Sequence, residues 1–306
     1  MAKKVKDPGF GYNSNKNAQS VLKEDGSSNV KHVNRRRNIG DLYTFFIDIK
    51  WWQFFLLIIL VYTLLNIVFG LLYVAIGIEQ ITKPKGNFFE DFLNGFFFSA
   101  QTLTTVGYGG IAPKGITVNF IAAFEAMIGL LSFSFITGML YGRFSKPKAI
   151  IEFSKNFLIR DFKDGKALMF RLMNSRKTVM IEPEISVTLS ITKEEKNGEF
   201  KRNFYKLKLE REKIMYLPTV WTIVHQIHED SPLFKYSNEE IKKLNANIYI
   251  LMSYHEEFFA QKVYQINSYS FKDIEYDVKF ISASSFDDLG FTVLDHDLLS
   301  EVEKLD

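Results

Sequence analysis

The chain has 306 residues, a net charge of +3 and no cysteine. This length allows two domains, the charge is too small to indicate a nucleic-acid-binding protein, and the lack of cysteine excludes disulfides and thiolate metal sites. The mean hydropathy is close to zero because it averages two regions. Two long apolar runs lie before about Tyr141, whereas the remainder mixes apolar and charged residues as soluble domains do.

Residues 1–39 are polar and have neither the apolar core nor the cleavage site of a signal peptide. We expect them to form a cytoplasmic N-terminal tail that is largely disordered, because they contain too few apolar residues to build a core.

Residues 40–50 predict an amphipathic helix along the inner membrane surface. One helical face carries the apolar residues Leu42, Phe45, Phe46 and Ile49. The alternative is an extension of the following membrane span. The interfacial helix is favoured because Asp41, Asp48 and Lys50 would be costly deeper in the bilayer.

Two segments are apolar enough to cross a membrane. No residue from Trp51 to Ile78 is charged, and this run exceeds the roughly 20 residues that a spanning helix needs. The second run, Ile116 to Tyr141, has Glu125 as its only charged residue and is rich in Gly, Ala, Ser and Thr. Small residues let membrane helices approach closely, so the second span is expected to pack against other helices and the first to face lipid.

Basic residues flank the pair of spans and predict that both termini are cytoplasmic. They are Arg35, Arg36, Arg37 and Lys50 before the first span, and Arg143, Lys146 and Lys148 after the second. The loop between the spans has three lysines, which are offset by three acidic residues.

Between the spans, Asn87 to about Thr102 predicts a short re-entrant helix, and Thr105, Val106, Gly107, Tyr108 and Gly109 follow it. Glycine at alternate positions lets successive carbonyls point toward one axis. Four such loops would form rings of oxygens that replace the water shell of K⁺, with the Thr105 hydroxyl as the innermost ring, so the pattern predicts a homotetramer. An ordinary extracellular turn is the alternative, and the position between two spans disfavours it.

From about Asp41 onward the chain resembles the inward-rectifier potassium channels, especially their bacterial members. Four segments carry the resemblance: residues 96–109 (FFFSAQTLTTVGYG), residues 145–148 (SKPK), residues 171–174 (RLMN) and the block at 221–233 containing WTIVH and EDSPL. The family implies a two-span pore domain at 40–145 with a re-entrant pore helix, followed by an immunoglobulin-like β-sandwich at 146–306 in the cytoplasm.

The residues of the second half agree with a β-sandwich. Five runs are rich in β-branched and aromatic residues: 179–191, 204–209, 220–227, 248–254 and 263–269. Asn197-Gly198 is a hairpin signal, and the absence of a G-x-G-x-x-G pattern disfavours a nucleotide-sensing Rossmann domain.

The second span is expected to line the pore. Phe133, Thr137 and Tyr141 recur every four residues, and four Tyr141 side chains would close the helix bundle, with Phe133 as a second constriction. Packing of either ring against a neighbouring helix is the alternative. Gly129 and Gly138 are candidate hinges, or they permit close packing.

By resemblance, Phe133 occupies the cavity position where strongly rectifying members carry an acid, so weak polyamine block is expected. Glu125 lies eight residues away, a rotation of roughly 80° on a helix. It therefore points away from the cavity, and we expect a structural, hydrogen-bonded role rather than ion coordination. Gln101 and the loop at 110–112 depart from the residues that form a filter-supporting salt bridge in some members.

Anionic lipids are the expected regulatory partner. A basic and aromatic cluster would lie at the inner leaflet, where each basic residue contributes about 1 kcal/mol of attraction. It consists of Lys50, Trp51, Arg143, Lys146 and Lys148. The resemblance implies phosphoinositides, with inhibition in the bacterial members; ordinary positive-inside anchoring is the alternative.

In the cytoplasmic half, the resemblance places Glu182 and Glu256 as acids along the ion path, where rings of charge would concentrate cations. Solvated charges at a sheet edge are the alternative for Glu256. His225 is expected to be a buried structural histidine.

A ligand-gated two-span channel remains an alternative. An enzyme anchored by a membrane hairpin would leave the sequence TVGYG unexplained, and the chain has no nucleophile–base motif. K⁺ at the filter, the permeant ion, is the only expected metal ion, and no cofactor is expected.

Overall fold

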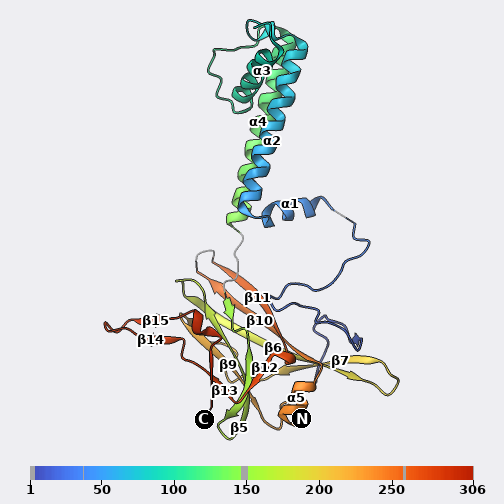
Figure 1. The fold of residues 1–306 in the computed structure, drawn as a ribbon, viewed down its shortest axis with the longest axis vertical. Coiled ribbons are helices and arrows are strands. Elements are labelled where there is room, and N and C mark those ends of the chain that lie inside the picture. The colour runs from blue at the N-terminus through green and yellow to red at the C-terminus, as the bar shows by residue number, and fades with distance from the viewer. Residues whose placement is uncertain (1–3, 37, 146–150, 258–259, 306) are drawn as a thin grey trace. The chain divides into compact units, whose positions relative to one another are not determined.

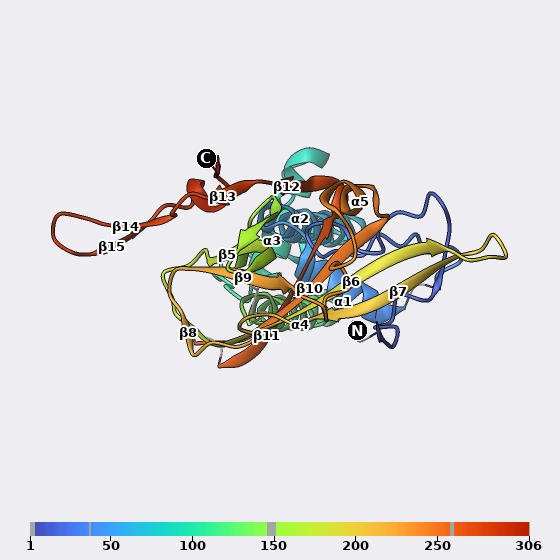
Figure 2. The same cartoon turned by 90° about the horizontal axis from the view of Figure 1, so that it is seen from below.

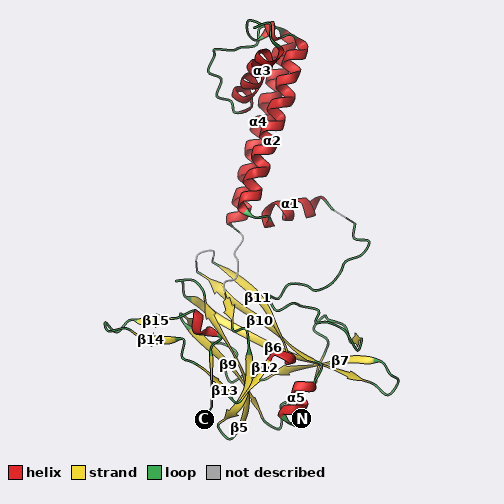
Figure 3. Ribbon diagram, viewed as in Figure 1, coloured by secondary structure: helices red, strands yellow, loops and turns green. Residues whose placement is uncertain are grey.

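The computed structural model describes residues 4–36, 38–145, 151–257 and 260–305. The chain divides into two compact units, one formed by residues 34–146 and the other by residues 1–33 together with 147–306. Figure 3 shows that the long helices belong to the first unit, and every strand among the described residues belongs to the second. The two units are described separately.

The unit 34–146 contains four α-helices and one short 3₁₀ turn (Figure 1). They are α1 (Ile39–Asp48), α2 (Trp51–Ile76), η1 (Ile78–Gln80), α3 (Phe88–Leu103) and α4 (Ile116–Phe144). By length and composition, α2 and α4 can each cross a membrane. They agree with the two predicted spans, and α1 agrees with the predicted amphipathic helix.

Helices α2 and α3 touch through their backbones at a pair of glycines. A Cβ atom on Gly95 would lie 2.8 Å from the carbonyl oxygen of Gly70, which is closer than a carbon atom can approach. Small residues at such a crossing permit van der Waals contact between membrane helices. The re-entrant helix is therefore held against the first span without intervening side chains at this point.

The second unit is built from two β-sheets. The larger sheet has the order β1 (Lys4–Val5), β7 (Phe200–Leu207), β6 (Met180–Glu194), β10 (Ala246–Glu256) and β11 (Gln261–Ser270), with β2 (Asn13–Ser14) also paired to β7 and β8 (Tyr216–Leu217) to β6. The smaller sheet has the order β12 (Ile274–Tyr276), β4 (Phe157–Phe162), β5 (Gly165–Asn174) and β3 (Ile151–Phe153), with β9 (Val220–Ile227) also paired to β5.

Small elements complete this unit. They are α5 (Asn238–Lys243), η2 (Phe271–Asp273), η3 (Asp297–Leu299), the pair β13 (Val278–Phe280) and β16 (Val302–Lys304), and the hairpin β14 (Ser284–Phe286) and β15 (Thr292–Leu294). Figures 1 and 2 both show that this hairpin extends away from the two sheets.

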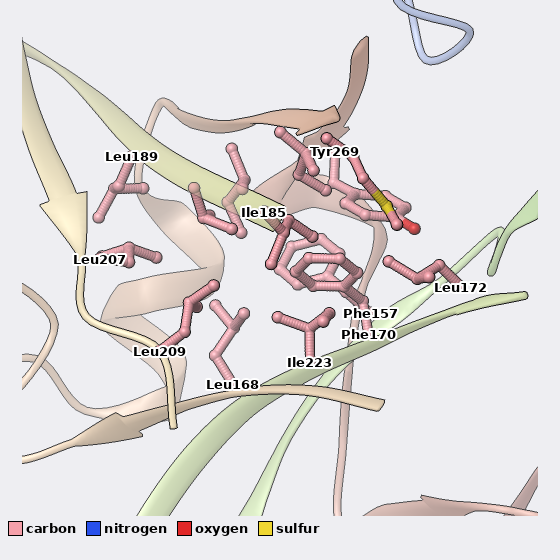
Figure 4. Packing of buried hydrophobic residues seen from close by; sticks show 14 of the residues in the cluster. Phe157, Leu168, Phe170, Leu172, Ile185, Leu189, Leu207, Leu209, Ile223 and Tyr269 are labelled. Carbon is pink, nitrogen blue, oxygen red and sulfur yellow. The ribbon is translucent and has the colours of Figure 1, made fainter. Parts of the chain in front are cut away.

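The two sheets bury one apolar core between them (Figure 4). Phe157 and Phe170 of the smaller sheet meet Ile185, Leu189 and Leu207 of the larger one, and all five are at most 1% exposed. This arrangement confirms the predicted β-sandwich, whose five predicted strand runs correspond to β6, β7, β9, β10 and β11. The predicted turn at Asn197-Gly198 joins β6 to β7, where Gly198 has a φ of +80°.

The N-terminal segment differs from the disordered tail that was expected. Strands β1 and β2 pair with the edge of β7, and Arg202 on β7 donates a 3.0 Å hydrogen bond to the Phe10 carbonyl. The Phe10 ring lies 4.4 Å from the ring of Tyr249. A few backbone hydrogen bonds and one aromatic contact can anchor a polar segment to a sheet edge, and such anchors leave no periodic signal in a sequence.

Candidate functional site

Helix α3 ends at the loop that carries the predicted ion site. The Asn87 side chain begins the helix by accepting a 3.1 Å hydrogen bond from the Phe89 amide. After Leu103 the chain turns back on the helix end, because the amides of Thr105 and Val106 donate to the carbonyls of Thr102 and Gln101 at 3.0 and 2.9 Å. These bonds satisfy part of the helix terminus and fix where the loop begins.

The backbone of this loop alternates in handedness. Thr105, Gly107 and Gly109 have φ values of +57°, +53° and +83°, whereas Val106 and Tyr108 between them do not have positive φ. Alternation of this kind turns successive peptide planes so that their carbonyls can point to one side. Glycine adopts a positive φ without steric cost, whereas the positive φ of Thr105 costs about 1–2 kcal/mol.

The three candidate gate residues lie on one exposed stripe of α4. The side chains of Phe133 and Tyr141 are 71% and 73% exposed in the single chain, and Thr137 between them is exposed as well. The Thr137 hydroxyl donates a 2.9 Å hydrogen bond to the Phe133 carbonyl, so its proton is used within the helix. Within the described residues, neither aromatic ring forms a contact with another aromatic ring.

The two candidate hinge glycines have different surroundings. A Cβ atom on Gly129 would lie 2.0 Å from the Leu103 carbonyl oxygen, whereas one on Gly138 would meet no atom within 4 Å. At Gly129 the structure therefore supports close packing of α4 against the end of α3. At Gly138 the open space is compatible with a hinge and with a close-packing position.

Glu125 is fully buried and hydrogen-bonded, in agreement with the structural role expected for it. Its carboxyl group lies between the hydroxyl of Tyr73, 2.6 Å away, and the hydroxyl of Ser99. Ser99 also contacts the side chain of Asn66 at 3.0 Å. The sequence analysis did not single out Asn66 and Ser99, although a polar residue inside an otherwise apolar span is the signal that would have identified Asn66.

The predicted lipid-contacting residues do not form one exposed group. Arg143 is half-buried and donates hydrogen bonds to the carbonyls of Phe46 and Ile49, at 2.5 and 2.7 Å. Its guanidinium also covers the ring of Trp51, while Lys50 is exposed. Lys146 and Lys148 lie outside the described residues.

The two predicted cytoplasmic acids are placed differently from each other. Glu182 lies on β6, is partly exposed and forms a 3.1 Å ion pair with Lys213. Glu256 is only 4% exposed and forms a 3.8 Å ion pair with Arg176. This burial differs from the exposed position expected of an acid that lines an aqueous path. Glu256 ends β10, where its side chain turns toward the arginine instead of toward solvent.

His225 is buried, as expected for a structural histidine. Its Nδ1 faces the Lys208 carbonyl at 2.7 Å, so Nδ1 carries the proton, and its Nε2 accepts from the Ser231 hydroxyl at 2.9 Å. Burial lowers the pKa of the imidazole, against the opposing effect of the Lys208 carbonyl. The neutral ring thus ties β9 to the loop that follows it.

Two apolar helices, a re-entrant helix between them and a loop of alternating handedness define a pore-forming channel subunit. Comparison with known sequences agrees. The pattern of the ion channel family matches residues 57–146, and that of the inward rectifier potassium channel C-terminal domain matches residues 151–306.

Individual relatives cover most of the chain. Inward rectifier potassium channel Kirbac3.1 from Paramagnetospirillum magnetotacticum is 32% identical over 263 residues, which are 85% of this chain and 88% of the relative. G protein-activated inward rectifier potassium channel 2 from Rattus norvegicus is 27% identical over 317 residues, which are 94% and 72% of the two chains. A solved structure of Pseudomonas fluorescens alkylpurine DNA glycosylase AlkC bound to DNA covers 60% of this chain and 48% of its own at a TM-score of 0.20, too low to indicate a shared fold.

The chain therefore belongs to the inward rectifier potassium channel family. It is a membrane protein with two spanning helices and a β-rich C-terminal domain, and it is a channel subunit and not an enzyme.

Proposed function

We propose that four copies of this chain surround one axis and conduct K⁺ passively and selectively, with residues 105–109 as the filter. The alternation of φ at Thr105, Gly107 and Gly109 is the observation that carries this proposal. The exposure of Val106 and Tyr108 in the single chain, 52% and 81%, also supports it, because neighbouring copies would cover these side chains.

In this assembly, rings of carbonyl oxygens replace the water shell of the ion, and the Thr105 hydroxyls add the innermost ring. The C-terminal end of α3 lies directly before the filter, so its partial negative charge favours a cation in the cavity below.

A matched pair of glycine variants tests the filter. Gly109 has a φ of +83°, which an alanine adopts only with strain, whereas the adjacent Gly110 does not have positive φ. We expect Gly109→Ala to abolish barium-sensitive K⁺ flux in liposomes, and Gly110→Ala to retain K⁺ flux over Na⁺ flux. Equal Na⁺ and K⁺ flux through the unaltered protein, or a monomer in solution, would refute the proposal.

The gate is proposed at the cytoplasmic end of α4, where four copies of Tyr141 would meet, with Thr137 and Phe133 along the same stripe. Their exposure in the single chain supports this placement. Tyr141→Ala should raise K⁺ flux by removing the obstruction. Phe135, also exposed but on a different face, provides the control, and an equal rise in Phe135→Ala would contradict the gate.

Both termini are proposed to be cytoplasmic. Anionic lipid is proposed to modulate the channel through direct contacts with Lys50, Trp51, Lys146 and Lys148. Arg143 is proposed to act indirectly, through its hydrogen bonds to the end of α1. Exposed Lys50 at the start of α2 supports this. Combined Lys→Gln substitutions at 50, 146 and 148 should remove the dependence of flux on anionic lipid. Lys114→Gln, in the loop between the spans, should leave the dependence intact.

The cytoplasmic unit is proposed to continue the ion path, and Glu182 is the acid that retains partial exposure there. Neutralising it as Glu182→Gln should lower single-channel K⁺ conductance most at low ionic strength, where charges are least screened. An unchanged conductance at low salt would exclude Glu182 from the path.

A further inference from the structure

Four fully buried polar side chains form a hydrogen-bonded chain inside the membrane unit. Tyr73 and Asn66 come from α2, Ser99 from α3 and Glu125 from α4, and each is at most 1% exposed. The contacts run from the Tyr73 hydroxyl to Glu125 Oε2 at 2.6 Å, from Glu125 Oε1 to Ser99 Oγ, and from Ser99 Oγ to Asn66 Oδ1 at 3.0 Å. The chain thus joins the two spans and the re-entrant helix.

The orientation of Asn66 fixes which of its atoms faces Ser99. The Asn66 amide nitrogen donates to the Tyr62 carbonyl at 2.7 Å. Turning the amide over would place its oxygen against that carbonyl, an arrangement without a proton. The side-chain oxygen of Asn66 therefore faces Ser99 and can only accept.

A count of protons then determines the state of Glu125. Three oxygen–oxygen contacts require three protons, one in each. The Tyr73 hydroxyl supplies one proton, to Glu125. The Ser99 hydroxyl supplies a second proton, which it must donate to Asn66 because the Asn66 oxygen carries no proton. The remaining contact, between Glu125 and Ser99, is satisfied only if the carboxyl group of Glu125 carries a proton and donates it.

The surroundings of Glu125 agree with this count. Within the described residues, Glu125 forms no ion pair with a lysine, arginine or histidine, and its titratable neighbour in the chain of contacts is Tyr73. A buried carboxylate without a cation is strongly destabilising, and a neutral acid with both oxygens hydrogen-bonded avoids this penalty.

We propose that Glu125 is a neutral carboxylic acid that donates to Ser99 and thereby positions the re-entrant helix between the two spans. Gly129, one turn further along α4, contacts the Leu103 carbonyl at the end of the same helix. The two contacts hold the last turn of α3, at Ser99 and at its final residue, Leu103. Glu125 is thus a positioning residue for the loop 105–109, an inference whose functional part rests on the proposed filter.

Glutamine distinguishes a neutral acid from a carboxylate at this position. The Gln amide can donate to Ser99 and accept from Tyr73, which reproduces the bonds of the protonated acid. A carboxylate would accept from both neighbours and leave the contact between Ser99 and Asn66 without a proton, so Gln would then supply a missing proton and make the variant more stable than the unaltered protein. Glu125→Gln should therefore keep the melting temperature of the tetramer and the K⁺/Na⁺ flux ratio, whereas Glu125→Leu should lower both or prevent assembly.

Infrared spectroscopy of the full-length channel in lipid provides the second measurement. At neutral pH the spectrum of the unaltered protein minus that of Glu125→Gln should contain the carbonyl absorption of a protonated acid. A difference that contains carboxylate bands instead, or a marked gain or loss of tetramer stability in Glu125→Gln, would overturn the proposal. The infrared result does not depend on ion selectivity, so failure of the filter proposal and failure of this one can be told apart.

Single-link variants keep the test informative if Glu125→Leu does not fold. Ser99→Ala interrupts the chain between Glu125 and Asn66 and should reduce K⁺/Na⁺ discrimination. Ser134→Ala is the matched control, since the Ser134 hydroxyl bonds only locally, to the Leu130 carbonyl, and is exposed. Equal effects of the two serine variants would contradict a positioning role.

Discussion

The guanidinium carbon of Arg143 lies 4.5 Å from the ring centroid of Trp51. The same guanidinium bonds the carbonyls of Phe46 and Ile49, where α1 ends and its last carbonyls have no helical partners. One side chain on α4 therefore joins the end of α1 to the beginning of α2. A displacement of the lower part of α4 is transmitted directly to the amphipathic helix.

Replacing Arg143 by lysine should loosen this joint. Lysine cannot reach both carbonyls with a planar fork or stack on the indole in the same way, and hydrogen bonds to a charged group contribute about 2 kcal/mol. We expect faster hydrogen exchange of the amides of α1 in Arg143→Lys, by about tenfold. Arg160→Lys, at a partly exposed arginine of the cytoplasmic unit, is the control, and unchanged exchange in α1 of Arg143→Lys would contradict this role of Arg143.

Alanine at the two glycines of α4 should have opposite effects. The methyl group of Gly129→Ala would collide with the rigid Leu103 carbonyl, which forces the helices apart. Gly138→Ala has open space in the single chain and gains about 1 kcal/mol of helix propensity. Melting of the detergent-solubilised tetramer should fall for the first variant and stay level or rise for the second. A fall for Gly138→Ala would indicate that a neighbouring copy contacts this position.

An acid at Phe133 should introduce rectification. An aromatic side chain offers no charge to hold a polyamine, whereas four carboxylates in a cavity attract multivalent cations. Phe133→Asp should therefore show voltage-dependent block by spermine in planar bilayers, with Phe133→Asn as the neutral control. Steep spermine block of the unaltered channel that persists after Glu182→Gln would show that Phe133 does not set the response.

The stability of the cytoplasmic unit should fall on acidification because of His225. Burial holds the pKa of the folded imidazole below its usual value, so the unfolded chain takes up the proton first. The stabilisation is complete above about pH 6.5 and is lost as the pH falls toward the folded pKa, by at most about 1.4 kcal/mol per pH unit. Hydrogen exchange of β9 in the full chain measures this.

The pH dependence should disappear in His225→Gln, although that variant is less stable at every pH. His228 is exposed, and its charge is the smallest of the three influences on the His225 pKa, after burial and the Lys208 carbonyl, so His228→Gln should retain most of the dependence. An identical pH dependence in the unaltered chain and in His225→Gln would assign the effect to other groups.

Local patterns made much of the membrane unit predictable. The uncharged run from Trp51 and the small-residue run from Ile116 each exceed a bilayer in length, and the glycines at 107 and 109 mark the alternating backbone. The hydrogen-bond partners of Arg143 and Glu125 could not be predicted from the sequence. Each bonds residues more than 25 positions away, and a sequence pattern records the chemical type of a side chain but not its distant partner.

Glu256 illustrates the limit on the cytoplasmic side. The predicted strand run ended at residue 254, whereas β10 continues to Glu256, and a single residue of register decides which face of the sheet a side chain occupies. The structure buries it near Arg176, a pairing that depends on how β10 lies against the loop between β5 and β6. The N-terminal strands were missed because two-residue pairings fall below any periodic signal.

The pairing of β1 and β2 with β7 means that the β-sandwich is assembled from both ends of the chain, with the entire membrane unit inserted between its pieces. During synthesis, residues 4–14 leave the ribosome long before residues 200–207, and two membrane helices must be integrated in the interval. The N-terminal segment consequently cannot pair until β7 has been synthesised. A tag fused to Met1 or a deletion of the first residues is therefore expected to alter the edge of a folded sheet.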